Sequence, residues 1–163
     1  FVGIDGAGGG KYAPPEALAA AIAARWPIPA PPKARPYVVC TGGEPLLQLD
    51  ESLIAALHAQ GFEVAVETNG TLPAPPSLDW ICVSPKANAP LRLSRGDELK
   101  LVYPQLEPEA QPERFVDLAF RHFFLQPLDG PGREAHVRAA IAYCLAHPQW
   151  RLSLQTHKLL GIP

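Results

Sequence analysis

Short apolar runs alternate with helical segments along this chain of 163 residues. The runs are nearly continuous and contain β-branched and aromatic residues, so they predict a mainly parallel sheet that is buried on both faces. Capping residues and apolar periodicity predict the helices, the last of which carries Val137, Ile141 and Leu145 along one side. We expect strands over 37–40, 62–67, 80–83, 99–102, 122–125 and 150–154, and helices over 14–26, 50–61, 109–118 and 134–147.

The connection between Glu67 and Trp80 is rich in proline and predicts a stiff loop where a crossover helix would be expected. A complete eightfold barrel therefore does not fit. We expect one α/β domain over residues 1–163, folded as an open or partial β/α barrel of mainly parallel strands. The chain has no methionine, not even at position 1, so we also expect an earlier strand upstream of Phe1 in a longer protein.

Composition narrows the class of protein. An apolar content of 47% and a net charge of -2 are ordinary for a globular protein and give no basic surface for nucleic acid. No apolar run reaches the length of a membrane span and no signal peptide is recognisable, so we expect a cytoplasmic protein. Cys40, Cys82 and Cys144 match no zinc or iron-sulfur spacing and are interpreted as buried structural thiols.

An apolar run leads directly into two glycines, a carboxylate and a proline at residues 37–45. Gly42 and Gly43 carry no side chains, so a ligand can approach their backbone N–H and C=O groups closely. Glu44 adds a fixed negative charge. This combination suits a ligand with an ammonium group beside an apolar body, such as an amino-acid moiety. The alternative is a tight turn between a strand and a helix.

Polar segments follow several of the expected strands at their C-terminal ends, where parallel β/α folds bind ligands. These segments are Thr41-Gly42-Gly43-Glu44, Glu67-Thr68-Asn69-Gly70, Ser84-Pro85-Lys86, Gln126-Pro127-Leu128-Asp129 and Gln155-Thr156-His157-Lys158. Each also has a simpler explanation: Asn69-Gly70 is a common turn, and Lys86 can be a solvated surface lysine. A carboxylate such as Glu67 is costly to bury unpaired, so we expect it to face a polar ligand or a cation. Alternation allows Lys100 to point to solvent or into a barrel.

These motifs together resemble the 7-carboxy-7-deazaguanine synthase family of radical S-adenosylmethionine enzymes, over essentially the whole chain. The resemblance rests on Gly42-Gly43-Glu44-Pro45 and on further segments: Phe1 to Gly6 with Gly10 to Tyr12, Glu67 to Gly70, Val83 to Lys86, Glu98 to Lys100, Gln126 to Gly130, and His147 to Lys158. It implies a modified, partial β/α barrel, assembled as a homodimer.

The resemblance also implies an activity. The family converts 6-carboxy-5,6,7,8-tetrahydropterin to 7-carboxy-7-deazaguanine with loss of ammonia, a step toward queuosine and related deazapurines. It uses S-adenosylmethionine, a 4Fe-4S cluster, Mg2+ and a reductant such as flavodoxin. The cluster generates a 5'-deoxyadenosyl radical that abstracts hydrogen from the substrate, so the cofactors supply the difficult chemistry and no side chain is implied as a catalytic acid or base.

Carried over residue by residue, the resemblance divides the motifs between two ligands. Gly42, Gly43 and Glu44 would hold the methionine end of S-adenosylmethionine. The rest of that pocket would be formed by Glu67, Asn69, Ser84, Lys86 and Gln126. The pterin would contact Thr41, His157 and the terminal carboxylate of Pro163.

The iron ligands are not among these motifs. The three cluster cysteines of the family, and the threonine that meets Mg2+, belong to a segment that ends before a Phe-Val-Gly-like sequence, and this chain starts at Phe1. Cys40, Cys82 and Cys144 lie on separate elements and cannot replace three thiolates of one loop. We therefore expect the cluster ligands upstream of Phe1. Two alternatives stay open: a β/α lyase with Lys86 or Lys100 as a Schiff-base amine, and a non-catalytic S-adenosylmethionine-binding module.

Overall fold

The computed structural model describes residues 9–26 and 35–162, which form a parallel sheet of six strands in the order β1-β2-β3-β4-β5-β6. Consecutive order means that each crossover moves the chain to the neighbouring strand, as in a segment of a β/α barrel and unlike a doubly wound sheet. The expected fold class is thereby confirmed. The chain divides into two compact units, Phe1–Glu67 with Ala74–Trp80, and Thr68–Pro73 with Ile81–Pro163.

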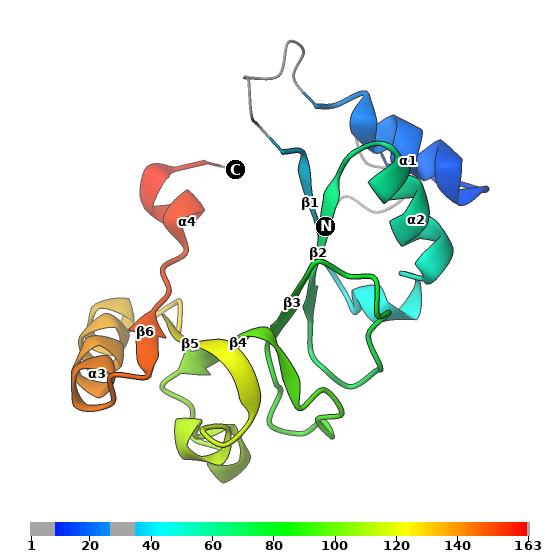
Figure 1. Cartoon of the computed structure of the whole chain (residues 1–163). Helices are drawn as coiled ribbons and strands as arrows, with labels where there is room; N and C mark the ends of the chain where they lie inside the picture. Colours follow the sequence, from blue (N-terminus) through cyan, green and yellow to red (C-terminus); the bar gives the residue numbers. More distant parts are fainter. Residues whose placement is uncertain (1–8, 27–34, 163) are drawn as a thin grey trace. The chain divides into compact units, whose positions relative to one another are not determined.

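In the first unit, β1 (Tyr37–Cys40) pairs in parallel with β2 (Glu63–Thr68), and Cys40 lies opposite Val66. Helices α1 (Pro15–Ala23) and α2 (Glu51–Ala59) pack against each other (Figure 1). Both helix starts follow from the sequence. Proline occupies the first turn of α1, where its missing N–H is not needed, and the Asp50 carboxylate caps α2 by accepting from Leu53 N at 2.9 Å.

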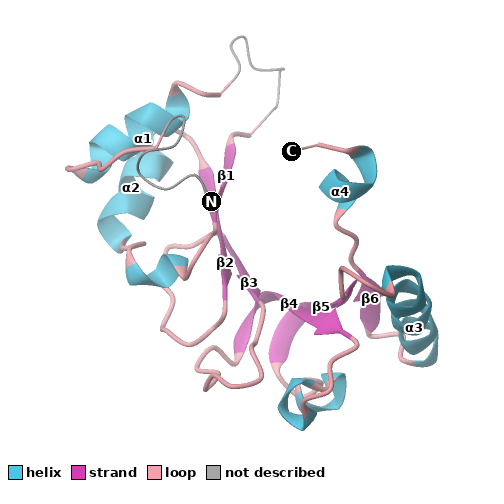
Figure 2. Ribbon diagram, turned by 180° about the vertical axis from the view of Figure 1, so that it is seen from behind, coloured by secondary structure: helices cyan, strands magenta, loops and turns pink. Residues whose placement is uncertain are grey.

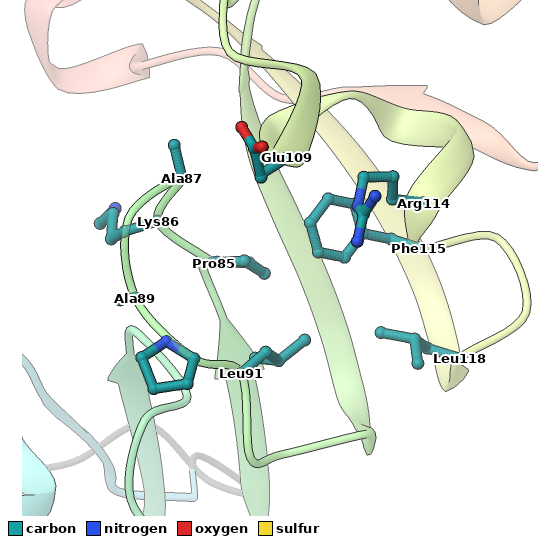
Figure 3. Close-up of a pocket in the computed structure, with 10 residues that line it drawn as sticks. Pro85, Lys86, Ala87, Ala89, Leu91, Glu109, Arg114, Phe115 and Leu118 are labelled. Atoms are coloured by element: carbon teal, nitrogen blue, oxygen red, sulfur yellow. The ribbon is translucent and has the colours of Figure 1, made fainter.

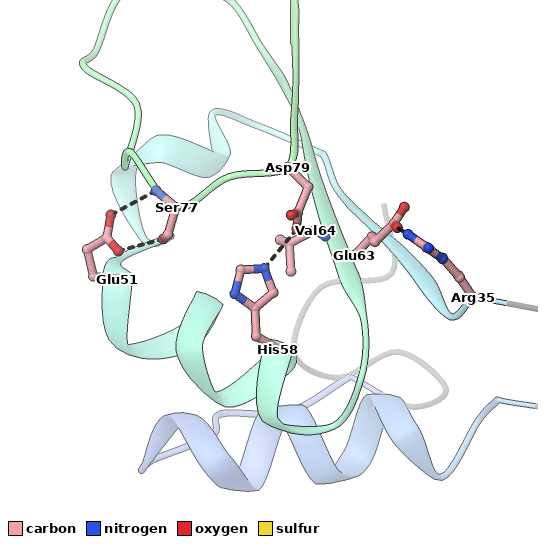
Figure 4. A network of polar contacts seen from close by, with 7 residues as sticks. All are labelled: Arg35, Glu51, His58, Glu63, Val64, Ser77 and Asp79. Carbon is pink, nitrogen blue, oxygen red and sulfur yellow. Dashed lines mark hydrogen bonds and ion pairs between the residues drawn. The ribbon is translucent and has the colours of Figure 1, made fainter.

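The proline-rich loop that follows β2 contains no helix, as expected, and side-chain hydrogen bonds hold its later part, residues 74–79, within the first unit (Figure 4). Asp79 Oδ2 accepts from the backbone N–H of Val64 at 2.7 Å and lies 2.8 Å from His58 Nε2. The hydroxyl of Ser77 donates to Glu51 at 2.5 Å. Asp79 thus gives a buried backbone N–H of β2 its acceptor, and the contacts with His58 and Glu51 fix the loop to α2.

The second unit is built on β3 (Trp80–Val83, whose first residue belongs to the first unit), β4 (Arg95–Tyr103), β5 (Ala119–Pro127) and β6 (Trp150–Leu152). Helix α3 (Arg133–Ala146) packs against β4, β5 and β6, and Figure 2 shows it beside β6. One face of these strands forms the core with Val83, Leu99, Leu101, Phe123, Leu125 and Trp150. Residues that alternate with them, such as Lys100 and Gln126, lie on the other face and are only half-buried. The sheet was expected to be buried on both faces, and in this unit only the core face is fully buried.

Two expectations about helices in the second unit are wrong. Residues 109–118 form no α-helix but two 3-10 turns, η2 (Pro108–Ala110) and η3 (Pro112–Arg114), because each proline starts a new turn and cannot continue a helix. In α3, Ile141 and Leu145 are exposed, and the helix contacts the core through Ala140, Tyr143 and Cys144. The small Ala140 side chain allows close packing there, so apolar periodicity identified the wrong face.

The expectation of buried structural thiols is confirmed only in part. Cys82 is buried, whereas Cys40 and Cys144 are half-buried. Partial burial raises the pKa of both the Cys40 and the Cys144 thiol above the usual value, which keeps them in the less reactive thiol form at neutral pH. Among the described residues, no helix is long and apolar enough to cross a membrane.

Asp79 should contribute measurably to the stability of the first unit. Asp79→Ala leaves the N–H of the fully buried Val64 without its acceptor, so we expect a loss of about 1 to 2 kcal/mol in urea unfolding at pH 7. Burial would raise the pKa of Asp79, but the Val64 N–H and His58 outweigh it and hold that pKa below its usual value. The contribution is therefore full above about pH 4 and lost as the pH falls further.

Asp117→Ala is the matched control, because Asp117 is an exposed aspartate whose side chain forms no hydrogen bond or ion pair in the described part of the chain. It should change stability by less than about 0.5 kcal/mol. Equal stability of the two variants would contradict the role given to Asp79.

Candidate functional site

The glycine turn after β1 has the backbone geometry that the sequence suggested. Gly42 has a φ of 90° and Gly43 a φ of 59°, both in the left-handed region that favours glycine. Thr41, Gly42 and Gly43 are exposed, and a Cβ placed on Gly43 would meet no atom within 4 Å. The backbone of this turn is therefore open to an approaching molecule.

Glu44 is held in a defined position at the end of this turn. Its carboxylate accepts a hydrogen bond from Leu46 N at 3.1 Å and so caps the 3-10 helix η1 (Pro45–Leu47), whose first residue, Pro45, is buried. The side chain is half-buried. A carboxylate fixed by a cap at an open turn provides a negative charge that need not reorganise when a cation binds.

Glu67 lies near the same edge of the first unit, because the pairing of Cys40 with Val66 brings the ends of β1 and β2 together. Its side chain is exposed, unlike those of Val66 and Thr68 beside it. Exposure agrees with the expectation that this carboxylate is not buried unpaired, and its contact with a polar ligand or a cation stays a prediction. Glu67 remains a candidate through its position at the strand end.

In the second unit, the Asn69-Gly70 segment forms a tight turn. Asn69 Oδ1 accepts from Thr71 N at 2.9 Å, and Gly70 has a φ of 77°. A Cβ on Gly70 would approach Val83 and Leu91 to 2.7 and 2.6 Å, so only glycine fits. The turn therefore explains why residue 70 is glycine and what the side-chain oxygen of Asn69 does. A contact between Asn69 and a ligand stays a prediction.

The structure brings Ser84 and Lys86 together after β3. Ser84 N donates to Thr68 O at 2.8 Å, and Lys86 Nζ donates to Ser84 Oγ at 3.2 Å. Lys86 is exposed, so it lacks the desolvation that would activate a Schiff-base lysine. Lys100 is half-buried and follows the core residue Leu99 on the opposite face of β4.

Two of the predicted polar segments meet at the end of β5. Gln126 is half-buried opposite Val102, and the Asp129 carboxylate in the following loop forms an ion pair with Lys158 Nζ. Lys158 lies with His157 on a short helix, α4 (Thr156–Leu160), where no helix was expected from the sequence. Gly161, with a φ of 66°, ends that helix and was the available signal. His157 is exposed, and Pro163 lies outside the described residues.

A hollow of about 300 Å³ in the second unit was also missed (Figure 3). Of the predicted site residues only Lys86 borders it, and its side chain extends away from Phe115 in this view. The lining is Pro85, Lys86, Ala87, Ala89, Pro90, Leu91, Glu109, Arg114, Phe115 and Leu118. This hollow depends on the 3-10 turns that replace the expected helix over 109–118, so the sequence pattern could not reveal it.

The described residues offer no site for an iron-sulfur cluster. They contain no group of three or more His, Cys, Asp or Glu side chains that could hold a metal ion. Cys40 ends β1, Cys82 lies in β3 and Cys144 lies in α3, so the thiols do not share a loop. The donor set therefore does not fit a cluster, whereas the open glycine turn with Glu44 fits an amino-acid group.

Comparison with known proteins identifies the family. The chain is 66% identical to a 7-carboxy-7-deazaguanine synthase from Bordetella pertussis and 62% identical to one from Caulobacter vibrioides, in each case over the whole chain and 75% of the relative. The chain belongs to the 7-carboxy-7-deazaguanine synthase family. A scan against protein-family models found no match.

A solved structure agrees with this assignment. The crystal structure of QueE from Escherichia coli matches with a TM-score of 0.68 and 33% sequence identity, covering 88% of this chain and 64% of that chain. Members of the 7-carboxy-7-deazaguanine synthase family are radical S-adenosylmethionine lyases that use a 4Fe-4S cluster. The Gly42-Gly43-Glu44 turn therefore lies in a chain whose family requires a site for S-adenosylmethionine.

The placement of the cysteines leads to a test with iron. Anaerobic reconstitution of the 163-residue chain with iron and sulfide should produce no 4Fe-4S absorption, because its three thiols lie on separate elements. The control is a relative of full length treated in the same way, which should acquire a cluster. Stoichiometric cluster on this chain, lost when Cys40, Cys82 and Cys144 are changed to serine, would contradict this interpretation.

Proposed function

We propose that this chain forms the ligand-binding part of a 7-carboxy-7-deazaguanine synthase. The enzyme would convert 6-carboxy-5,6,7,8-tetrahydropterin to 7-carboxy-7-deazaguanine with loss of ammonia, in the biosynthesis of queuosine and related deazapurines. Identity of 66% over the whole chain supports this assignment, and the open glycine turn is the structural observation that carries it.

The methionine end of S-adenosylmethionine is proposed to bind at Gly42, Gly43 and Glu44. The ammonium would face the Glu44 carboxylate, which its cap to Leu46 N already holds in place. The exposed backbone of Gly42 and Gly43 would offer N–H donors to the carboxylate and C=O acceptors to the ammonium. A charge-assisted hydrogen bond of this kind contributes about 1.5 to 3 kcal/mol.

The remainder of S-adenosylmethionine is assigned by family resemblance to polar residues near strand ends: Glu67, Asn69, Ser84, Lys86 and Gln126. The types of side chain suit the ligand. Ribose hydroxyls need acceptors such as a carboxylate or an amide oxygen, and adenine needs amide or hydroxyl partners. The hydrogen bond between Lys86 and Ser84 supports their acting as one unit. When bound, S-adenosylmethionine supplies the organic radical, and these residues bind and orient it.

The pterin is proposed to contact Thr41, His157 and the terminal carboxylate of Pro163. Thr41 is exposed immediately before the glycine turn, and His157 is exposed on α4. A polar heterocycle that carries a carboxylate needs several donors on entry, because each unpaired polar group costs about 1 to 3 kcal/mol. The imidazole and the threonine hydroxyl are donors of the required kind.

The remaining requirements of the reaction are proposed to lie outside these residues. The 4Fe-4S cluster and Mg2+ would be held by a segment beyond the 163 residues, since the thiols of this chain are dispersed. By resemblance, the enzyme would be a homodimer in the cytoplasm that receives electrons from a reductant such as flavodoxin. If that segment lacked cluster cysteines, the protein would instead be a non-catalytic S-adenosylmethionine-binding module.

A matched pair of glycine variants tests the proposed S-adenosylmethionine site. Gly43 and Gly61 both have left-handed φ values, 59° and 84°, and a Cβ on either would meet no atom within 4 Å. Each change to alanine should therefore cost about 1 to 2 kcal/mol of stability from backbone strain. Only Gly43→Ala should also weaken S-adenosylmethionine binding, by about tenfold or more, because its methyl group would occupy the ligand's approach.

Binding is measured by calorimetry on the cluster-loaded enzyme of full length. Wild-type affinity in Gly43→Ala would remove the glycine turn from the site. An equal loss of affinity in Gly61→Ala would show that backbone strain, and not ligand contact, is responsible.

A further inference from the structure

Packing does not hold the short helix that carries His157. None of the residues of α4 is buried, and its apolar side chains are open to solvent: Leu159 is 53% exposed, Leu160 67% and Ile162, just beyond the helix, 55%. A helix of this length is not stable by itself. Some other contact must therefore keep α4 in place.

Hydrogen bonds within the segment do not supply this contact. Ser153 N donates to Leu125 O at 2.9 Å, which is the last backbone bond to the sheet. Beyond it, the backbone bonds are local: Lys158 N and Leu159 N donate to Gln155 O, and Ile162 N donates to His157 O. Within the described part of the chain, the ion pair between Lys158 and Asp129 is the polar contact that connects residues 154–162 to another element.

Asp129 provides a fixed anchor for this pair. Asp129 lies in the loop that follows β5, and the preceding residue, Leu128, is held by two hydrogen bonds. Leu128 N donates to Tyr103 O at 2.8 Å, and Leu128 O accepts from His136 Nδ1 at 2.8 Å. The hydrogen bond from Lys158, the N–H of Gly130 and the charge of Arg133 lower the pKa of the Asp129 carboxyl, so it is ionised at neutral pH. The anchor is rigid and negative, and it lies three residues beyond Gln126.

We propose that Lys158 and Asp129 are positioning residues, whose ion pair holds α4 beside the end of β5 and thereby sets the affinity for the pterin substrate that His157 contacts. This inference rests on the proposed function. Neither side chain needs to touch a ligand. Breaking the pair would release the helix and its histidine, while the residues assigned to S-adenosylmethionine would keep their positions.

The ion pair between Lys158 and Asp129 should hold α4 less strongly as the salt concentration rises. Both side chains are 41% exposed, and exposed ion pairs are weak and screened by ions. The helix should therefore exchange between a docked and a released state, and only the docked state would bind substrate well. The apparent KM for the pterin should then rise with ionic strength in the wild type.

The test uses charge reversals in the cluster-loaded enzyme of full length. Lys158→Asp and Asp129→Lys should each raise the KM for the pterin about tenfold, with S-adenosylmethionine affinity within about twofold of wild type. The double variant with exchanged charges should regain most of the lost affinity, and Lys158→Arg should resemble wild type. Arg138→Glu is the control, because it reverses a charge in the exposed ion pair between Arg138 and Glu134 on α3.

Hydrogen exchange supplies a readout that does not depend on turnover. The amides of Leu159 and Ile162 should lose protection in either single reversal and regain it in the exchanged pair. Wild-type rates of hydrogen exchange in both single variants would contradict the proposal that this ion pair holds α4 in place. Faster exchange with a wild-type KM would overturn the positioning role.

Failure of the proposed function would give a different result. A wild-type enzyme that does not convert the pterin, or a His157→Ala variant with wild-type KM, would contradict the substrate assignment. A KM that rises in the single reversals and is not recovered in the exchanged pair would also overturn the pairing, because the two charges would then act separately.

Discussion

Parallel strand pairing brings residues that are distant in the sequence to one edge of each unit. In the first unit, the register that places Cys40 opposite Val66 aligns the glycine turn after β1 with Glu67 near the end of β2. In the second, Val102 lies opposite Gln126, and the loop beyond β5 carries Asp129 to α4. Since parallel strands all end on the same side, each new strand returns the chain to this edge, where a new polar segment follows it.

The glycine turn combines an open backbone with a fixed carboxylate, which suits a binding site. The left-handed φ values at Gly42 and Gly43 favour glycine, so no side chain covers the backbone of this turn, and the next residue, Glu44, is fixed by its cap to Leu46 N. A preorganised carboxylate loses little conformational freedom on binding a cation. By contrast, the polar contact between α4 and the rest of the second unit is an exposed ion pair. The proposed S-adenosylmethionine site would therefore be more rigid than the segment proposed to contact the pterin.

Local signals in the sequence were sufficient for much of the fold. The strands at 37–40 and 80–83 have the predicted bounds, and Asp50 caps α2 as expected, because caps and continuous apolar runs act over a few residues. The failures depended on tertiary packing. Apolar periodicity could not show that α3 docks through Ala140, nor that residues 109–118 form two 3-10 turns in place of a helix. The contact between Lys158 and Asp129 joins residues 29 positions apart, and no local pattern specifies it.

A crystal structure of the full-length enzyme with its cluster and S-adenosylmethionine is the most direct test of the central claim. The account predicts that the methionine ammonium lies within hydrogen-bond distance, about 2.7 to 3.2 Å, of the Glu44 carboxylate and of the backbone at Gly42 and Gly43. Methionine density elsewhere, for example in the hollow between Leu91 and Phe115, would contradict it.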